Sequence, residues 1–334
     1  MNSPVTSAPS CWAISDGAAG NERQALALAR ALGLAPRVLR IRMREPWAAF
    51  APRLVFGARN AITDAEGRSL TSPWPDIAIG CGRRAALVTR LLREWNDGNT
   101  FTVQILDPRI DTRAFDVVVA PQHDRTIGAN VIHSIGALNA VDQDWLAQGR
   151  AHFAALATLP APRTAVLIGG TTRAQRLDDA YFDALLERLA ARHATDGGSF
   201  LVSVSRRTPL STAARLRESL AKFPGAFWSQ PDKGDNPYAG FLGWADRFVV
   251  TPDSVNMLSE ACATGKPVYT FAPRPITGKL ASFHADMLAS GHVRRIDDNV
   301  HIAQPPALQE TAAIAELVRE RWQRFVAGMG ARCA

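Results

Sequence analysis

The chain has 334 residues, of which 47% are hydrophobic and 21% are charged. These values exclude a disordered chain, a collagen-like repeat and a small disulfide-stapled protein. Lysine and arginine together number 38 against 31 acidic residues, so the net charge is +7. This charge is compatible with anionic ligands, nucleic acid or an acidic membrane surface. Nucleic acid is the least favoured partner, because the arginines are dispersed along the chain.

The cysteines and the N-terminal residues indicate the compartment. None of the four cysteines forms a C-x-x-C pair, so neither a zinc site nor a thioredoxin-type motif is expected. Residues 1–10 lack the cationic and apolar stretches of a secretion signal, and no apolar run reaches membrane-spanning length. We therefore expect a cytoplasmic protein, and its basic charge suits peripheral contact with the acidic inner membrane.

Short apolar runs alternate with longer helical patterns through the first half of the chain. The helical patterns cover residues 22–32 and 84–95. The predicted strands cover residues 11–15, 37–41, 77–80, 100–106 and 117–120. Strands of this length separated by helices are typical of β-α-β units and a parallel sheet.

The same alternation restarts after a largely helical segment, residues 142–161. The predicted strands and helices of the second half cover residues 164–169, 180–193, 200–205, 211–222, 248–251, 254–264, 268–271 and 309–329. We predict an α/β fold in which two Rossmann-like domains face each other across a cleft. The predicted parts are residues 1–158, residues 159–308, and a terminal helix in residues 309–334 that packs back on the first domain.

The strongest local signal is the sequence VVTPDSVNMLSEACATGKPV, residues 249–268. A strand is predicted to end at Thr251, so the free amides of the following helix can bind an anion together with the helix dipole. Glu260 lies further along that helix and can accept hydrogen bonds from ligand hydroxyls. A merely well-capped β-α-β unit is the alternative interpretation. The predicted ligand-binding residues here are Asp253, Ser254, Val255, Asn256 and Glu260.

Three segments carry a resemblance to a known family. Residues 12–24 (WAISDGAAGNERQ), residues 236–238 (NPY) and residues 253–268 resemble the elongated-mitochondria-type mitochondrial fission protein family, which has many bacterial members. The resemblance extends from about residue 12 to about residue 290 and implies a GT-B glycosyltransferase-like fold. In such a fold the first domain is the acceptor side. The second binds a nucleotide-diphosphate sugar, with Ser254 at the diphosphate and Glu260 at the ribose.

The loop after the first strand is the first candidate site on the acceptor side. Asp16, Gly17 and Gly20 open the first helix, but two glycines do not make a dinucleotide fingerprint. The glycines would let a substrate approach the backbone, and Asp16 is a candidate general base. The alternative is that Asp16 caps a turn or the helix.

Two further strand ends in the first half carry candidate residues. Arg83 follows Gly80-Cys81-Gly82 at a predicted helix start, where its charge opposes the helix dipole and so suggests an anionic ligand. His123 follows the strand at 117–120 and is a candidate catalytic acid or base. A solvated arginine and a simply hydrogen-bonded histidine are the alternatives.

Loops of the second half complete the predicted donor site. Two loops follow consecutive strands, so both are expected to face the same edge as Ser254, with amides and arginines arranged around a phosphate. Lys279 is expected to reach a leaving diphosphate. The predicted loop residues are Gly169, Gly170, Thr171, Ser205, Arg206 and Arg207.

The sequence has no metal-binding motif at the end of a predicted strand, where a diphosphate-bound metal would lie. Asp142-Gln143-Asp144 matches D-x-D, but it lies in the helical segment without a preceding strand. We therefore expect no metal and no cofactor, with positive side chains and a helix dipole stabilising the leaving group.

The most favoured function is a GT-B-like glycosyltransferase that uses a nucleotide-diphosphate sugar, with an envelope lipid or a saccharide as acceptor. One alternative is a non-catalytic GT-B-shaped scaffold that binds a membrane-associated partner. A sugar-nucleotide epimerase is the other alternative, because it uses the same two-domain architecture.

Overall fold

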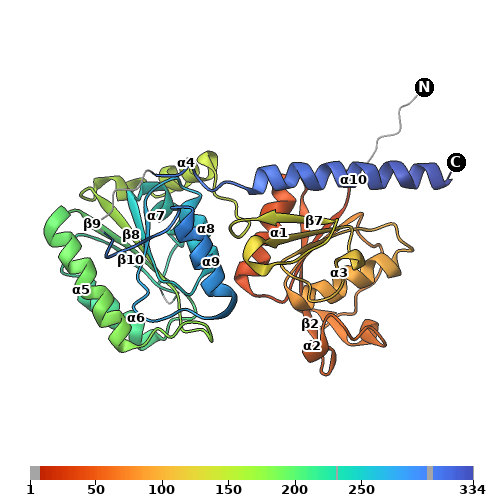
Figure 1. The fold of residues 1–334 in the computed structure, drawn as a ribbon, viewed down its shortest axis with the longest axis horizontal. Coiled ribbons are helices and arrows are strands. Elements are labelled where there is room, and N and C mark those ends of the chain that lie inside the picture. Colours follow the sequence, from red (N-terminus) through yellow and green to blue (C-terminus); the bar gives the residue numbers. More distant parts are fainter. Residues whose placement is uncertain (1–7, 231, 299–303, 334) are drawn as a thin grey trace. The chain divides into compact units, whose positions relative to one another are not determined.

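The computed structural model describes residues 8–230, 232–298 and 304–333. The chain divides into two compact units (Figure 1). The first contains the chain up to Ala140 and the residues from Glu310 onward, and the second runs from Val141 to Gln309.

The first unit is built on a seven-stranded sheet in the order β3-β2-β1-β4-β5-β6-β7. All neighbours are parallel except β2 and β3, which are antiparallel. The strand order reverses between β1 and β4, which is where ligands bind in such sheets. The strands are β1 (Cys11–Ser15), β2 (Pro36–Met43), β3 (Ile62–Asp64), β4 (Ile77–Cys81), β5 (Phe101–Ile105), β6 (Val117–Pro121) and β7 (Val131–Ser134).

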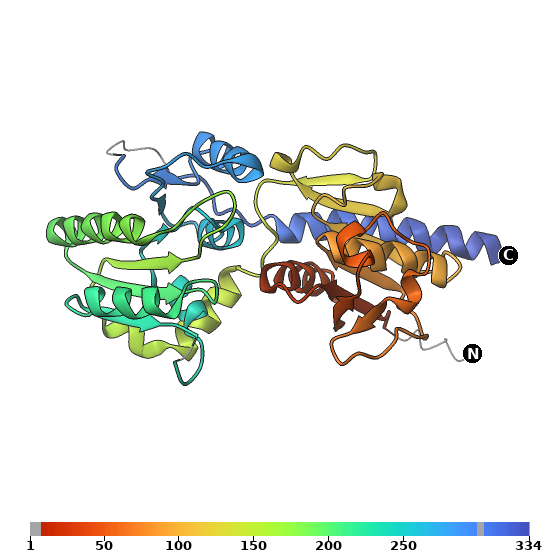
Figure 2. The same cartoon turned by 90° about the horizontal axis from the view of Figure 1, so that it is seen from below.

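Helices cover both faces of this sheet, so its central strands are continuous buried apolar runs. Helix α10 contributes to the core of this unit and runs along it in Figure 2. One core cluster contains residues of α1 and β1 together with Ile314, Ala315 and Val318 of α10. The helices and 3₁₀ turns are α1 (Ala19–Ala31), α2 (Trp47–Phe50), η1 (Ala58–Asn60), α3 (Arg83–Trp95), η2 (Thr112–Ala114), η3 (Gln122–Asp124) and α10 (Thr311–Cys333).

The second unit is built on a six-stranded parallel sheet in the order β10-β9-β8-β11-β12-β13. Here the strand order reverses between β8 and β11. The strands are β8 (Arg163–Ile168), β9 (Ser199–Val204), β10 (Gly225–Trp228), β11 (Arg247–Val250), β12 (Val268–Thr270) and β13 (Arg294–Arg295). The helices are α4 (Gln143–His152), the 3₁₀ turn η4 (Ala154–Thr158), α5 (Asp179–Asp196), α6 (Leu210–Leu220), α7 (Tyr238–Trp244), α8 (Val255–Cys262) and α9 (Gly278–Ala289).

The boundary between the units differs from the predicted one near residue 158. Helix α4 belongs to the second unit because it packs closely on α7. A Cβ at Gly149 would lie 2.5 Å from the carbonyl oxygen of Ala239, and one at Gly240 would lie 2.6 Å from Phe153. Glycines on both helices therefore allow the two backbones to approach, and this contact fixes α4 to the second sheet.

Candidate functional site

Two loops meet where the strand order of the second sheet reverses. Gly169 and Gly170 follow β8, and Thr251, Asp253 and Ser254 follow β11. The carboxyl ends of parallel neighbours lie at one edge of a sheet, so the predicted donor-site residues are brought together here.

The carboxylate of Asp253 is the centre of this cluster. Its side chain is 0% exposed and accepts hydrogen bonds from the Gly170 amide at 3.1 Å and from the Thr251 hydroxyl at 2.6 Å. The Arg207 guanidinium pairs with it at 2.6 Å, across from the end of β9. Buried charge is tolerated only when it is paired and hydrogen-bonded, and Asp253 meets both conditions.

In the structure, Gly169, Gly170 and Thr171, which were predicted to surround a phosphate, make contacts within the protein. A Cβ at Gly169 would overlap the carboxylate of Asp253, and one at Gly170 would lie 2.5 Å from the carbonyl oxygen of Arg207. The Gly169 amide donates to Thr251, and the Thr171 hydroxyl exchanges hydrogen bonds with the backbone of Leu177. The glycines therefore make room for the protein's own side chain and backbone.

The start of α8 retains the geometry of an anion site. The hydroxyl of Ser254 caps the helix by accepting from the Met257 amide at 3.3 Å. Val255 and Asn256 form the first turn and are half-buried. Their amides precede the first intrahelical bond, from Leu258 to Ser254, and the positive end of the helix dipole favours an anion beside them.

A pocket of about 500 Å³ opens beside this cluster at the ends of β9 and β10. Ser205, Arg206 and Arg207 line it as predicted loop residues, while Leu210, Ser229 and Gln230 line it from positions that the sequence did not suggest. Arg207 belongs to both features, because it lines the pocket and binds Asp253. The side chain of Arg207 is 47% exposed, so it connects the buried carboxylate to solvent.

Glu260 lies on α8 as predicted, but it is only 6% exposed. The Tyr238 hydroxyl of α7 donates to its Oε2 atom at 2.5 Å. The sequence predicted a carboxylate that accepts hydrogen bonds from ligand hydroxyls, which needs access to the ligand. The structure instead places it in a buried position with a phenolic partner, which holds the carboxylate in one orientation.

Two residues of α9 occupy different environments. Lys279 is exposed in the first turn of the helix, so its proposed contact with a leaving group stays a prediction. His284 is buried, and its Nε2 atom lies 2.7 Å from the carbonyl oxygen of Pro252, next to Asp253. Burial lowers the pKa of His284 from its ordinary value of 6.5, although the Pro252 carbonyl and the Asp253 charge oppose this effect.

We expect the stability of the second unit to fall on acidification because of His284. A histidine with a lowered pKa stabilises the fold above its unfolded-state pKa of 6.5, and this contribution is lost as the pH falls from there toward the folded-state value. Urea denaturation across that pH range measures the loss. His284→Gln should flatten this dependence, and an unchanged slope would assign the effect to another group.

In the first unit, the predicted loop after β1 lies at the other topological switch point. Oδ1 of Asp16 accepts from the Ala18 amide at 3.3 Å and from the side chain of Asn21 at 3.2 Å. Gly17 has a φ of 82° with open space around it, and Gly20 lies in the first turn of α1. Asp16 therefore orders its own turn, and its role as a general base stays a prediction.

Gly82 brings the end of β4 against this loop. Its φ is 89°, and a Cβ there would lie 2.5 Å from the side-chain nitrogen of Asn21. Burial, together with the negative charge of Asp16, raises the pKa of the Cys81 thiol. The start of α1 and the loop after β4 thus lie against each other at the switch point.

Arg83 is used differently from the prediction. Its guanidinium donates to the carbonyl oxygens of Ala48, Ala49 and Ala51 at 3.0, 2.6 and 2.9 Å. The arginine therefore fixes the segment around α2 instead of presenting its charge to an anion. His123 lies in η3 after β6, at the predicted carboxyl edge, and its catalytic role stays a prediction.

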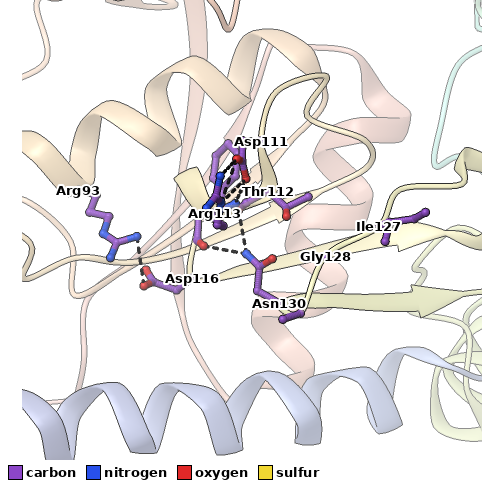
Figure 3. Close-up of a pocket in the computed structure, with 10 residues that line it drawn as sticks. Arg93, Asp111, Thr112, Arg113, Asp116, Ile127, Gly128 and Asn130 are labelled. Atoms are coloured by element: carbon purple, nitrogen blue, oxygen red, sulfur yellow. Dashed lines mark hydrogen bonds and ion pairs between the residues drawn. The ribbon is translucent and has the colours of Figure 1, made fainter.

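A second pocket, of about 540 Å³, lies at the opposite edge of the first sheet, before β6 and β7 (Figure 3). The Arg113 guanidinium donates hydrogen bonds to the Asp111 carboxylate and lowers the pKa of that carboxyl to about 2. Arg93 forms a second ion pair, with Asp116, at 3.5 Å. Each charge has an internal partner here, and the pocket is remote from the switch point. We assign it no ligand.

Two negative findings concern the described residues, 8–230, 232–298 and 304–333. Among them, no group of three histidine, cysteine, aspartate or glutamate side chains is placed to hold a metal ion. No helix in the same residues is both long and apolar enough to cross a bilayer.

Two Rossmann-like units, each with a largely parallel sheet and its own switch point, define the GT-B glycosyltransferase-like fold that the family resemblance implied. A crystal structure described as the glycotransferase of kitacinnamycin is similar, with a TM-score of 0.53 and 14% identity over 96% of this chain and 94% of that chain. This likeness concerns the fold.

The chain belongs to the mitochondrial fission ELM1 family, whose model matches residues 19–322. The mitochondrial fission protein ELM1 of Arabidopsis thaliana is 27% identical over 92% of this chain and 89% of its own length. An uncharacterized protein of Rickettsia prowazekii is 24% identical over 92% of this chain and 97% of its own length. The predicted family resemblance is therefore confirmed.

Proposed function

We propose that the second unit binds a nucleotide-diphosphate sugar and that the protein is a metal-independent, cytoplasmic glycosyltransferase. The observation that carries the proposal is the position of Arg207, held by buried Asp253 at the mouth of the pocket. The half-buried start of α8 follows Asp253 directly. A fixed cation and a helix N-terminus at one switch point suit a diphosphate.

The parts of the ligand are assigned by chemistry. The pocket lined by Val204, Leu210 and Ala213 offers apolar surface for the nucleoside. The diphosphate would take the remaining N–H groups of Arg207 and the first-turn amides of α8. The buried carboxylate of Glu260 would accept from ribose hydroxyls, since a charged acceptor makes the stronger hydrogen bonds.

In this proposal the first unit supplies the acceptor side. Asp16 beside Gly17 and Gly82 is the candidate base at the switch point, and His123 lies at the same carboxyl edge. The acceptor would be an envelope lipid or a saccharide. In this metal-independent proposal, positive groups near the diphosphate would stabilise the leaving charge.

Arg207→Gln is the variant that tests nucleotide binding. The first step is a thermal-shift screen with uridine, guanosine and adenosine diphosphates. We expect one of them to raise the Tm of the wild-type protein. Loss of a charged hydrogen-bond donor costs about 1.5–3 kcal/mol, so the variant should bind at least tenfold more weakly. Isothermal titration measures the affinity, and EDTA should leave it unchanged.

The matched control is Arg113→Gln. This arginine also pairs with an aspartate and lines a pocket, but at the amino edge of the first sheet. The Arg113→Gln variant should bind the nucleotide with the same affinity as the wild type. Equal affinity of the Arg207 variant and the wild type would reject the assigned diphosphate position.

A non-catalytic scaffold is the second candidate. It is favoured by one observation, namely that the space at Gly169 and Gly170 is filled by Asp253 and Arg207. The relation to a mitochondrial fission protein points the same way. A wild-type protein that none of the nucleoside diphosphates or their sugars stabilises would support this scaffold function.

A further inference from the structure

A segment between β2 and β3, here called the aromatic loop (residues 44–60), presents large apolar side chains outward. Phe56 is 89% exposed and Phe50 is 60% exposed. Exposed aromatic side chains that lie close together in the sequence mark a contact surface more often than isolated ones do. The loop contains α2 and η1, and in Figure 1 α2 lies on the side of the first unit opposite α10.

The aromatic loop is held in place by specific contacts. Arg83 donates to the carbonyl oxygens of Ala48, Ala49 and Ala51, within and directly after α2. The indole of Trp47 donates to the carbonyl oxygen of Phe56 at 2.9 Å, and the rings of Trp47 and the side chain of Val55 pack on a core cluster. The backbone that carries Phe50 and Phe56 is therefore held in place, so little backbone entropy remains to be lost on binding.

The charge around these aromatics is positive. The aromatic loop contains three arginines and one glutamate, Glu45, and Arg42 lies just before it at the end of β2; all five of these side chains are exposed. Within the described part of the chain, none of these arginines forms an ion pair with an acidic side chain. Their contacts are to neutral groups: Arg53 binds the carbonyl of Arg109 at 3.0 Å, and Arg59 lies over the rings of Trp74 and Trp95. The positive charge therefore remains available to an anionic partner.

The position of the aromatic loop links this surface to the candidate acceptor site. The loop leaves the carboxyl end of β2, next to β1, and Arg83 ties it to the start of α3, directly after β4. It therefore borders the switch point that carries Asp16 and Gly82. A surface bound by the loop would lie beside that site.

We propose that the aromatic loop docks on an anionic lipid bilayer. Phe50 and Phe56 enter the headgroup region, and the arginines face the lipid phosphates. Aromatic side chains beside cations match an interface that is apolar on one side and negatively charged on the other. This contact does not require the nucleotide site, so it goes beyond the proposed transferase activity.

The test is flotation of the full-length protein with vesicles of phosphatidylcholine alone or mixed with phosphatidylglycerol. We expect the wild type to float with the mixed vesicles and to be released by salt, because exposed charges are screened. The double variant Phe50→Ser, Phe56→Ser should lower the bound fraction about tenfold or more, because each aromatic side chain that enters the bilayer contributes favourable transfer free energy. Arg42→Gln should weaken binding about fivefold at low salt.

Ile127→Ser is the matched control, because Ile127 is also 89% exposed but lies at the pocket of the amino edge. It should float as the wild type does. Equal losses for the Ile127 and Phe56 variants, equal binding to both vesicle types, or no flotation at low salt would overturn the proposal. The proposal would also be overturned if the wild type bound no lipid but self-associated in sedimentation velocity, and the double variant abolished that self-association. Nucleotide affinity of the double variant, measured in parallel, should be unchanged and keeps failure of the two proposals distinct.

Discussion

Gly169→Ala is expected to cost about 3 kcal/mol of unfolding free energy, which is large for the addition of one methyl group. The new Cβ would overlap the carboxylate of Asp253, whose side chain is 0% exposed and cannot move into solvent. Overpacking typically costs about 1–3 kcal/mol, and each hydrogen bond that the displaced buried carboxylate loses costs about 1–3 kcal/mol more. Urea denaturation followed by circular dichroism measures the change.

A double-mutant cycle shows whether Asp253 is the cause. Asp253→Ala alone should be strongly destabilising, because Arg207, Thr251 and the Gly170 amide lose their shared partner. In that background the added methyl group at position 169 meets no carboxylate. The two changes should therefore couple by about 2 kcal/mol.

The control for this cycle is Gly328→Ala. Gly328 lies in α10 with no atom within 4 Å of a built Cβ, so alanine should be neutral or slightly stabilising there. Strict additivity of the changes at positions 169 and 253 would mean that the carboxylate does not occupy the space beside Gly169.

Glu260 gives the second large expected effect, on ligand binding. Because its carboxylate is buried against the Tyr238 hydroxyl, Glu260→Ala should lower stability by about 1–3 kcal/mol as well as remove binding. This differs from the expectation for a residue at the rim, where the alanine variant would melt normally. Glu260→Gln is the better variant, since its amide oxygen can still accept from Tyr238.

We expect Glu260→Gln to weaken binding of a nucleoside diphosphate about tenfold or more, because it exchanges a charged acceptor for a neutral one. Titration with the matching 2′,3′-dideoxynucleotide separates the cause. Wild-type protein should discriminate strongly between the two ligands, and the variant should discriminate little. Tyr238→Phe should keep most of the discrimination. Undiminished preference for the ribonucleotide in Glu260→Gln would place the ribose elsewhere.

The central strands could be predicted from the sequence because each is a short, continuous apolar run. β1, β4, β8 and β9 are buried along nearly their whole length, and their predicted ranges match the structure within one or two residues. β10, at one edge of its sheet, was not predicted. Its four residues are exposed or half-buried, so no apolar periodicity marks it.

The location of the candidate site followed from the same pattern, while its internal contacts did not. Strand ends of a parallel sheet share one edge, which placed Asp253, Arg207 and Gly169 together. However, the Gly170 amide and its acceptor are 83 residues apart in the chain. Whether that amide donates to a carboxylate or to a ligand depends on which side chains the fold brings within hydrogen-bond distance. The contacts of Arg83 with α2 were hidden for the same reason.

The path of the chain has a consequence for synthesis on the ribosome. The second unit is continuous from Val141 to Gln309, whereas the first unit is completed only by residues after Glu310. Ile314, Ala315 and Val318 belong to a core cluster that includes β1, and the whole second unit is translated between β1 and these residues. Domains generally fold as units while the chain emerges. The second unit can therefore fold during translation while the first still lacks part of its core, so the unit that is begun first is finished last.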